Sequence, residues 1–156
     1  MILLCDTRQK AHKHLNIEGY CRKHNITMIP SCLSVGDYQL QGGQVCVDTK
    51  KDLLELAQDL HRDRLAFNKK YKKCYKENLK LIVLVEEKVK STRDIVNWRS
   101  KYTKITGRYL LDMITDLRLS YGIRFMFCNR IDTGKCLIDL LTGGENDTEQ
   151  TINRRD

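Results

Sequence analysis

The most informative stretch of this chain is Val35-Gly36-Asp37-Tyr38-Gln39-Leu40-Gln41-Gly42-Gly43-Gln44-Val45-Cys46-Val47-Asp48-Thr49-Lys50. Two short runs of alternating apolar residues flank a Gly-Gly pair, and this pattern predicts a β-hairpin. Side chains two apart on a strand share a face, so Asp48 and Lys50 are expected to point one way while Thr49 points the other. The stretch therefore predicts a charged pair on one face of a strand whose neighbours are apolar.

The spacing of the charged residues in this hairpin is that of a metal-dependent phosphodiesterase. Asp37 begins the first arm and can reach Asp48 across the hairpin, which gives the pattern Asp-x10-Asp-x-Lys. Two carboxylates can hold a hard divalent cation against a phosphate, and an ammonium group two residues on can orient the attacking water or offset developing charge. Lys50 would position the water or help to deprotonate it. Because Asp-x-Lys alone is common in proteins, this prediction depends on the hairpin and on the Gly-Asp pair that precedes it.

Three motifs resemble those of the XPF-type structure-specific endonuclease domain, which belongs to the PD-(D/E)XK nucleases. They are Asp6-Thr7-Arg8, Gly36-Asp37-Tyr38 and Val47-Asp48-Thr49-Lys50, where the family has Asp-x-Arg-Glu, Gly-Asp-Tyr and Glu-Arg-Lys. The resemblance covers about residues 1–140. Gln9 replaces the first Glu, and Asp48-Thr49 replaces Glu-Arg. Asp48 keeps a carboxylate on a shorter side chain, so metal binding is expected to survive, whereas the number of metal ions is left open.

The resemblance implies an endodeoxyribonuclease that depends on Mg²⁺ or Mn²⁺ and acts in DNA repair or recombination. The implied catalytic residues are Asp37, Asp48, Lys50 and Asp6, and the implied metal ligands are Asp37, Asp48 and Asp6. Asp6 follows an apolar run and is either a site residue, which we favour, or the N-cap of the next helix. A second hypothesis is a catalytically inactive DNA-binding or assembly module with the same fold, because the first motif carries Gln9.

DNA is the implied partner. Family members usually pair, as homodimers or heterodimers, through a helix-hairpin-helix module that confers a preference for branched or flap DNA. This chain ends before such a module could begin, so a preference for one DNA structure is not readable here. A domain of this size without that module suits a phage or mobile-element genome.

A basic segment from Arg62 to Lys80 contains eight Lys or Arg residues against two acidic ones. Helical spacing places Phe67, Tyr71 and Cys74 on one stripe, which is expected to face the sheet. A separate stripe consists of Lys69, Lys72, Lys73, Lys76 and Lys80. Like charges at this spacing repel one another, so beside a metal site an anionic partner explains them better than a solvated face. The residues predicted to contact the DNA backbone are Arg8, Arg62, Arg64, Lys69 and Lys73.

The order of predicted elements indicates an α/β fold with a restriction-endonuclease-like, mixed and mainly parallel sheet flanked by helices. Apolar runs predict strands at residues 1–5, 26–29, 79–85 and 123–128 besides the hairpin. Periodicity and caps predict helices at residues 10–24, from 53 onward, and at 62–80, 106–122 and 133–141. We expect a nuclease domain over residues 1–142 and a disordered tail over residues 143–156.

Several further side chains are assigned to surface or core. The first helix is predicted to have an apolar stripe that includes Ala11, Leu15 and Glu18. Its polar surroundings predict exposed histidines, at positions 12, 14 and 24. Glu86 and Glu87 follow a strand and either add carboxylates to the site or, as we favour, form a helix cap or a surface pair. The only tryptophan, Trp98, either stacks on an unpaired base or, as we favour, is buried against the domain.

Composition limits the classes of protein that this chain can belong to. The 156 residues carry a formal net charge of +8, which favours a polyanionic partner over an acidic small substrate. Seven cysteines without a Cys-x-x-Cys pair favour reduced thiols over a disulfide framework or a zinc site. No run approaches the roughly 18 apolar residues of a membrane span. We therefore expect no membrane partner and a location in the cytoplasm, or in the host cytoplasm or nucleoid for a phage protein.

Overall fold

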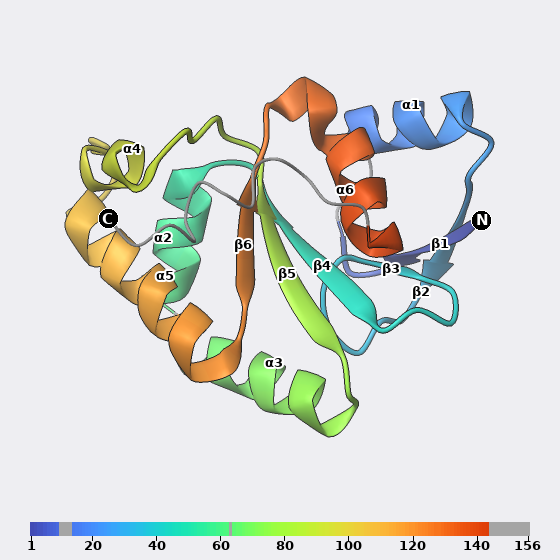
Figure 1. The fold of residues 1–156 in the computed structure, drawn as a ribbon, viewed down its shortest axis with the longest axis horizontal. Helices are drawn as coiled ribbons and strands as arrows, with labels where there is room; N and C mark the ends of the chain where they lie inside the picture. Colours follow the sequence, from blue (N-terminus) through green and yellow to red (C-terminus); the bar gives the residue numbers. More distant parts are fainter. Residues whose placement is uncertain (10–13, 63, 144–156) are drawn as a thin grey trace.

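One six-stranded sheet with helices on both faces forms the centre of the computed structural model (Figure 1). The structure describes residues 1–9, 14–62 and 64–143. The strands are β1 (Ile2–Asp6), β2 (Thr27–Ser31), β3 (Tyr38–Leu40), β4 (Val45–Lys50), β5 (Lys80–Val85) and β6 (Arg124–Phe127). The helices are α1 (Leu15–Lys23), α2 (Leu53–Arg62), α3 (Arg64–Lys76), α4 (Thr92–Val96), α5 (Gly107–Tyr121) and α6 (Thr133–Thr142), with a short 3₁₀ helix η1 (Arg130–Asp132).

The sheet has the strand order β2-β1-β3-β4-β5-β6. β1 and β2 are parallel, β3 is antiparallel to both of its neighbours, and β4, β5 and β6 are parallel to one another. The predicted mixed, mainly parallel sheet is therefore confirmed. β5 lies between two parallel neighbours and under helices, which explains its nearly continuous apolar sequence.

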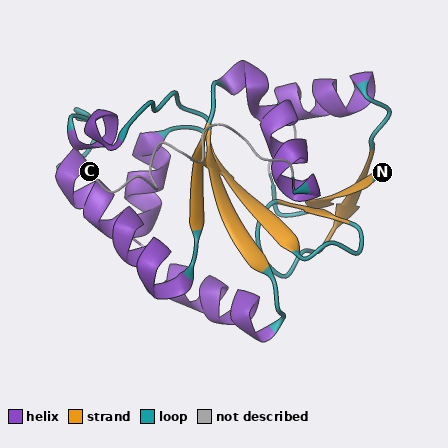
Figure 2. Ribbon diagram, viewed as in Figure 1, coloured by secondary structure: helices purple, strands orange, loops and turns teal. Residues whose placement is uncertain are grey.

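The helices form a layer on each side of the sheet (Figure 2). α2, α3 and α5 cover one face, and α1 and α6 cover the other (Figure 1). The core under the first group includes Leu56, Val83 and Ile114, whereas the second core includes Ile82 and Leu137. Val83 and Ile82 are adjacent on β5 and belong to different cores, as the alternation of side chains along a strand requires.

The predicted hairpin is present as β3 and β4, with Tyr38 opposite Val47. Gly42 turns the chain with a φ of +76°, and Gly36 precedes β3 with a φ of +77°. Residues with a side chain rarely adopt such angles. A Cβ at Gly36 would also lie 3.0 Å from the carbonyl oxygen of Val47. Gly36 therefore allows the chain to pass close to β4 and brings Asp37 to the end of that strand.

The prediction for the first helix is partly wrong. Leu15 is 63% exposed, whereas Ile17 and Cys21 are buried in the core between the helix and the sheet. The apolar stripe was placed on the wrong side because it was chosen from Leu15 and Glu18, and the helix is rotated so that its neighbouring face packs on α6 and the sheet. Ala11 of the predicted stripe lies outside the described residues.

The predicted histidine positions are also partly wrong. His24 is exposed as expected, but His14 retains only 5% of its exposure and is buried among polar groups. His12 lies outside the described residues. Trp98 is partly buried against the core beneath α4 and α5, in line with its predicted place.

The edges of the chain show smaller differences. β2 extends beyond the predicted end at residue 29 and includes Pro30, which is compatible with hydrogen bonding because β2 is an edge strand. Of the predicted tail, residues 144–156 lie outside the described residues. In the part of the chain that the structure describes, no helix is both long enough and apolar enough to span a bilayer.

Candidate active site

The predicted site residues meet at one edge of the sheet. β1 and β4 run in the same direction and end at Asp6 and Lys50, while β3 runs the opposite way and begins directly after Asp37. The backbone N–H of Asp6 donates to the carbonyl of Asp37 at 2.8 Å, and that of Asp37 donates to the carbonyl of Val47 at 2.8 Å. The carboxyl ends of parallel strands are where open α/β sheets place their ligand sites.

Asp37 is anchored to β4 through a single oxygen. Its Oδ2 accepts a hydrogen bond from the backbone N–H of Thr49 at 2.8 Å and another from the Thr49 hydroxyl at 2.5 Å. Asp37 is also close enough to Lys50 for its charge to raise the pKa of that ammonium. Both hydrogen bonds use Oδ2, so Oδ1 receives none from the described residues.

Asp48 and Lys50 share one face of β4, as predicted, and belong to a chain of four charges. The carboxylate of Asp48 lies 3.5 Å from Lys50 Nζ and 2.9 Å from Lys70 Nζ of α3. Lys50 Nζ also lies 2.8 Å from Asp59 Oδ2 of α2. Asp48 and Lys50 are nearly buried, at 3% and 7% exposure. Two carboxylates and two ammonium groups therefore neutralise one another beneath α2 and α3.

The charges in this cluster fix its protonation state. Burial alone would raise the pKa of Asp48, but the ammonium groups of Lys50 and Lys70 hold it below its usual value. Burial alone would lower the pKa of Lys50, but Asp48 and Asp59 hold it above its usual value. At neutral pH the site therefore contains an ionised Asp48 and a protonated Lys50.

Asp6 lies beside Asp37 but has other partners. Its Oδ2 accepts a hydrogen bond from Arg8 Nε at 2.8 Å, and its Oδ1 lies 3.4 Å from the backbone nitrogen of Leu33. Arg8 also donates to the carbonyl of Leu33 at 2.7 Å. These contacts make Asp6 a clamp between the end of β1 and the segment after β2. Among the described residues, the side chain of Asp6 makes no hydrogen bond that would cap a helix, as the predicted alternative would require.

An open cleft of about 440 Å³ lies beside these carboxylates. It is lined by Asp6, Arg8, Gln9, Asp37, Lys51, Leu54, Glu55 and Gln58. The side-chain nitrogen of Gln9 is buried and has no hydrogen-bond partner among the described residues. The cleft thus has the carboxylates of Asp6 and Asp37 on the sheet side and three side chains of α2, Leu54, Glu55 and Gln58, on the other.

The donor set fits a hard divalent cation held by few protein ligands. Asp37 and Asp48 are carboxylates at the ends of adjacent strands, and Mg²⁺ is commonly bound by one or two carboxylates with several waters. Among the described residues, no group of three or more His, Cys, Asp or Glu side chains could hold a metal ion. The predicted set of three aspartates is therefore not assembled as one cluster. Lys70 and Lys50 occupy the carboxylate of Asp48, so a cation there must displace an ammonium group.

A comparison with known protein families identifies the family to which a chain with this fold and these motifs belongs. The ERCC4 domain matches residues 5–139. This chain belongs to the ERCC4 domain family. The family is one of nucleases, so the predicted resemblance to the XPF-type endonuclease domain is confirmed.

Solved structures support the same assignment of the fold. This ERCC4 domain is similar to XPF from Aeropyrum pernix, with a TM-score of 0.66 at 19% sequence identity. It is also similar to XPF from Aeropyrum pernix in complex with DNA, with a TM-score of 0.65 at 20% identity. In each comparison 90% of this chain is covered, and this chain spans 63% of the length of the archaeal chain. A comparison with curated proteins finds no match.

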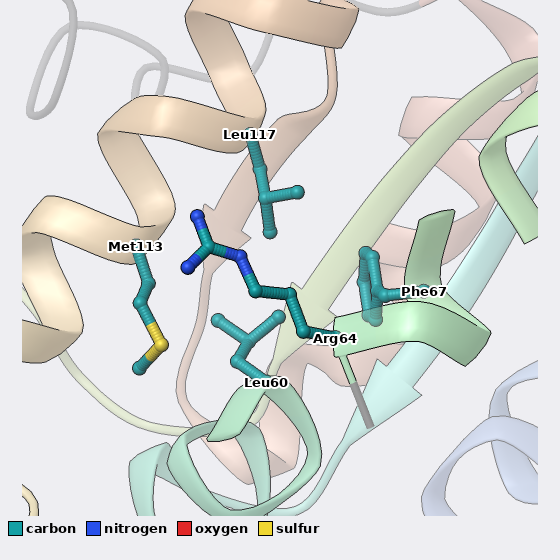
Figure 3. A pocket seen from close by; sticks show the side chains of 5 residues that line it. All are labelled: Leu60, Arg64, Phe67, Met113 and Leu117. Atoms are coloured by element: carbon teal, nitrogen blue, oxygen red, sulfur yellow. The ribbon is translucent and has the colours of Figure 1, made fainter. Parts of the chain in front are cut away.

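The predicted DNA contacts of the ERCC4 domain lie in different surroundings. Arg62, Lys69 and Lys73 are exposed. Arg64 extends over an apolar pocket between α3 and α5, lined also by Leu60, Phe67, Met113 and Leu117 (Figure 3). Its guanidinium lies 3.8 Å from the carboxylate of Asp116 on α5. Arg8 is held by Asp6 at the cleft, as described above. The exposed lysines of α3 are thus better placed for a large anion than Arg64.

Sequence reasoning missed three residues of this site. Lys70 was not singled out because it falls between the apolar stripe and the lysine stripe of α3, yet it binds Asp48. Asp59 pairs with Lys50 from α2, at a position that only the packing of α2 on β4 defines. His14 accepts or donates a hydrogen bond at 2.9 Å to the Thr49 hydroxyl. Its place before a helix in a polar segment gave no signal of burial.

Proposed function

We propose that this ERCC4 domain is an endonuclease that hydrolyses DNA phosphodiester bonds with Mg²⁺ or Mn²⁺. The observation that carries the proposal is that Asp37, directly before β3, and Asp48 and Lys50, at the end of β4, lie at one sheet edge, where Asp37 lines an open cleft. One carboxylate oxygen of Asp37 accepts no hydrogen bond from the part of the chain that the structure describes, and Asp48 is ionised. Residues 1–142 would form the catalytic unit, and its work on DNA favours a cytoplasmic location or the host nucleoid.

The roles of the side chains follow from their contacts. Asp37 and Asp48 would hold the cation, which when bound supplies Lewis-acid polarisation of the phosphate and a nucleophilic water at neutral pH. Lys50 is protonated and therefore acts by positioning the water and by offsetting negative charge rather than by accepting a proton. Asp59 orients Lys50 through a contact of 2.8 Å. Asp6 and Arg8 would shape the cleft and fix the position of the segment that carries Asp37.

Several features support DNA as the substrate. The chain carries a net charge of +8, and α3 presents Lys69, Lys72, Lys73 and Lys76 to solvent. The similar archaeal XPF has been solved in complex with DNA. The family relationship favours branched or flap DNA as the preferred structure. It also favours pairing as a homodimer or heterodimer, which sedimentation of the purified chain would test.

A second function is favoured by one observation. Lys70 occupies an oxygen of Asp48 at 2.9 Å, and Lys50 binds the same carboxylate, so Asp48 is already neutralised without a metal ion. Gln9 adds to this because it replaces the acid of the first motif. A chain with these changes could retain the fold and bind DNA without cutting it, as a DNA-binding or assembly module.

One experiment separates the two functions. End-labelled flap, fork and plain duplex DNA are incubated with the purified chain in Mg²⁺, in Mn²⁺ or in EDTA. The nuclease predicts cleavage with a metal ion and none with EDTA, and a faster reaction on one of the branched substrates identifies the preferred structure. DNA binding without cleavage in either metal would overturn the nuclease and establish the module.

A further inference from the structure

A buried polar chain begins at Asp37 and crosses to the face of the sheet covered by α1 and α6. Thr49 points to this face, opposite to Asp48 and Lys50, and its hydroxyl contacts Asp37 Oδ2 at 2.5 Å. The same hydroxyl lies 2.9 Å from Nε2 of His14, at the residue before α1. His14 Nδ1 lies 3.4 Å from Glu86 Oε1, at the end of β5. Four residues far apart in the sequence are thus joined in one line.

The direction of the hydrogen bonds in this chain follows from the chemistry of its ends. Two oxygens 2.5 Å apart need a hydrogen between them, and an ionised carboxylate can only accept. The Thr49 hydroxyl therefore donates to Asp37, which leaves only its lone pairs for His14. His14 must then donate from Nε2. Its donated hydrogen bond prevents the hydroxyl from rotating away from Asp37.

The other ring nitrogen of His14, Nδ1, faces Glu86. Glu86 is buried, and although burial alone would raise its pKa, the neighbouring His14 and Thr133 and the charge of Arg130 hold the pKa below its usual value. The carboxylate of Glu86 approaches Nδ1 of His14, with Oε1 at 3.4 Å. The approach is longer and less direct than a well-formed hydrogen bond, since Nδ1 has no such partner among the described residues. The ring of Tyr38 packs edge-on against His14, with centroids 6.1 Å apart.

The arrangement exceeds what packing alone requires. Packing alone would be satisfied if the ring lay between Tyr38 and Glu86 without binding any hydroxyl. Instead its second nitrogen binds the hydroxyl that binds Asp37, and that hydroxyl uses the same carboxylate oxygen as the Thr49 backbone N–H. Two donors on Oδ2 hold the carboxylate in one orientation.

We propose that His14 is a positioning residue for Asp37, which acts through the Thr49 hydroxyl to keep the carboxylate oriented for a divalent cation. This role rests on the proposed function. Partners that orient metal ligands in this way typically affect metal affinity by about 10- to 100-fold. His14 does not touch the cation or the DNA, so its effect appears first in metal binding.

The test measures binding of Mn²⁺ alone to the metal-free chain by calorimetry. The variants are Thr49→Val, which keeps the shape and removes the hydroxyl, His14→Leu, and the double variant. We expect each single variant to weaken Mn²⁺ binding by about 10- to 100-fold. The Mn²⁺ affinity of the double variant should equal that of the single variant with the lower affinity, because both substitutions break the same chain of contacts. His14→Gln, whose amide can donate to Thr49, should restore most of the affinity. His24→Leu alters an exposed histidine on the same helix and is the matched control, with unchanged affinity expected.

A second readout does not depend on the metal ion. In the ¹⁵N NMR spectrum of the metal-free chain, Nε2 of His14 should carry a hydrogen, because it donates to the Thr49 hydroxyl, and Asp37→Asn should shift its signal. His14→Leu with wild-type Mn²⁺ affinity and a lowered melting temperature would make His14 a structural residue and overturn the inference, while the nuclease would stand if the wild-type chain cleaves DNA. A folded wild-type chain that binds no Mn²⁺ would remove the inference and the metal-dependent function together. Should His14→Leu fail to fold, Thr49→Val and the NMR signals decide the result.

Discussion

At the scale of single residues, Lys70 is the side chain that most affects whether the site can take a metal ion. It lies 2.9 Å from Asp48 Oδ2, whereas Lys50 lies 3.5 Å from the other oxygen and is also bound by Asp59. The Lys70 side chain is 35% exposed, compared with 9% for Lys50. Lys70 can therefore leave Asp48 and be solvated at lower cost, which makes it the group that a cation displaces.

Replacing Lys70 by Met should strengthen metal binding. The variant keeps the length of the side chain and removes the ammonium group that competes for Asp48. Hydrogen bonds to charged groups contribute about 1.5–3 kcal/mol, and partial exposure reduces this, so we expect about a tenfold gain in Mn²⁺ affinity by calorimetry. Lys69→Met, at the exposed neighbouring position, is the control and should leave the affinity unchanged. Equal affinities in the wild-type chain and Lys70→Met would show that Lys70 does not compete with the metal ion.

Asp48 also makes stability depend on pH in acid. Lys50 and Lys70 hold its pKa below the usual value, so its folded-state pKa is lower than the value of about 3.9 expected when unfolded. Its contribution is fully present above that pH and is lost as the pH falls through the folded-state pKa. The melting temperature of the wild-type chain should therefore fall below about pH 4. Asp48→Asn has no group to titrate there and should show a shallower fall, and equal slopes for both chains would contradict this account.

The residues that could be predicted from the sequence are those fixed by local rules. Asp48 and Lys50 were placed on one face by the alternation of a strand, and Asp37 was placed beside them by the hairpin. His14 and Lys70 could not be found in this way, because their partners lie 35 and 22 residues away along the chain. Such contacts depend on how helices pack on the sheet, which periodicity does not specify.

At the scale of elements, α3 combines a buried apolar stripe with an exposed lysine face, as its sequence predicted. Phe67, Tyr71 and Cys74 pack in the core with the sheet and α5. Lys69, Lys72, Lys73 and Lys76 are exposed. Lys70 lies on the same helix and its ammonium group contacts Asp48, so α3 is in contact with the predicted site. We therefore propose this helix as the route by which the DNA backbone approaches the predicted site.

Changing the four exposed lysines to Gln tests this route. Each phosphate contact releases counterions, so the affinity for duplex DNA falls with salt at a log-log slope of about −0.9 per contact. If all four lysines contact the backbone, the fourfold variant should show a slope shallower by about 3 to 4 units, measured in Ca²⁺ to prevent cleavage. The matched control changes four exposed lysines elsewhere, Lys88, Lys90, Lys101 and Lys104. A slope that changes only in the control would move the DNA path to the segment before α5.

The elements also show where sequence patterns are insufficient. β5 was predicted from its continuous apolar run, and α3 and α5 were predicted from their apolar stripes. Thr106 and Gly122 mark the ends of α5, as expected. α1 is short, and its burial is set by contact with α6 near the other end of the chain. Its buried face could therefore not be chosen from its own sequence.

At the scale of the whole molecule, the topology of the sheet assembles the site. β1, β4 and β5 end at the same edge where β3 begins, so Asp6, Asp37 and the end of β4 come from segments that are distant in sequence. Membership in the ERCC4 domain family and the likeness to archaeal XPF agree with this arrangement. The motif residues are local signals, but the cleft beside them arises only when α2 packs against this edge of the sheet.

The central claim is that Asp37 and Asp48 hold a cation that drives cleavage of DNA. The most direct measurement is the initial rate of Mg²⁺-dependent cleavage of end-labelled flap DNA by the wild-type, Asp37→Asn and Asp48→Asn chains, each checked for its fold by circular dichroism. The account predicts cleavage by the wild-type chain that EDTA abolishes, and none by either folded variant, although both should still bind DNA in Ca²⁺. Cleavage by both variants at the wild-type rate would contradict it.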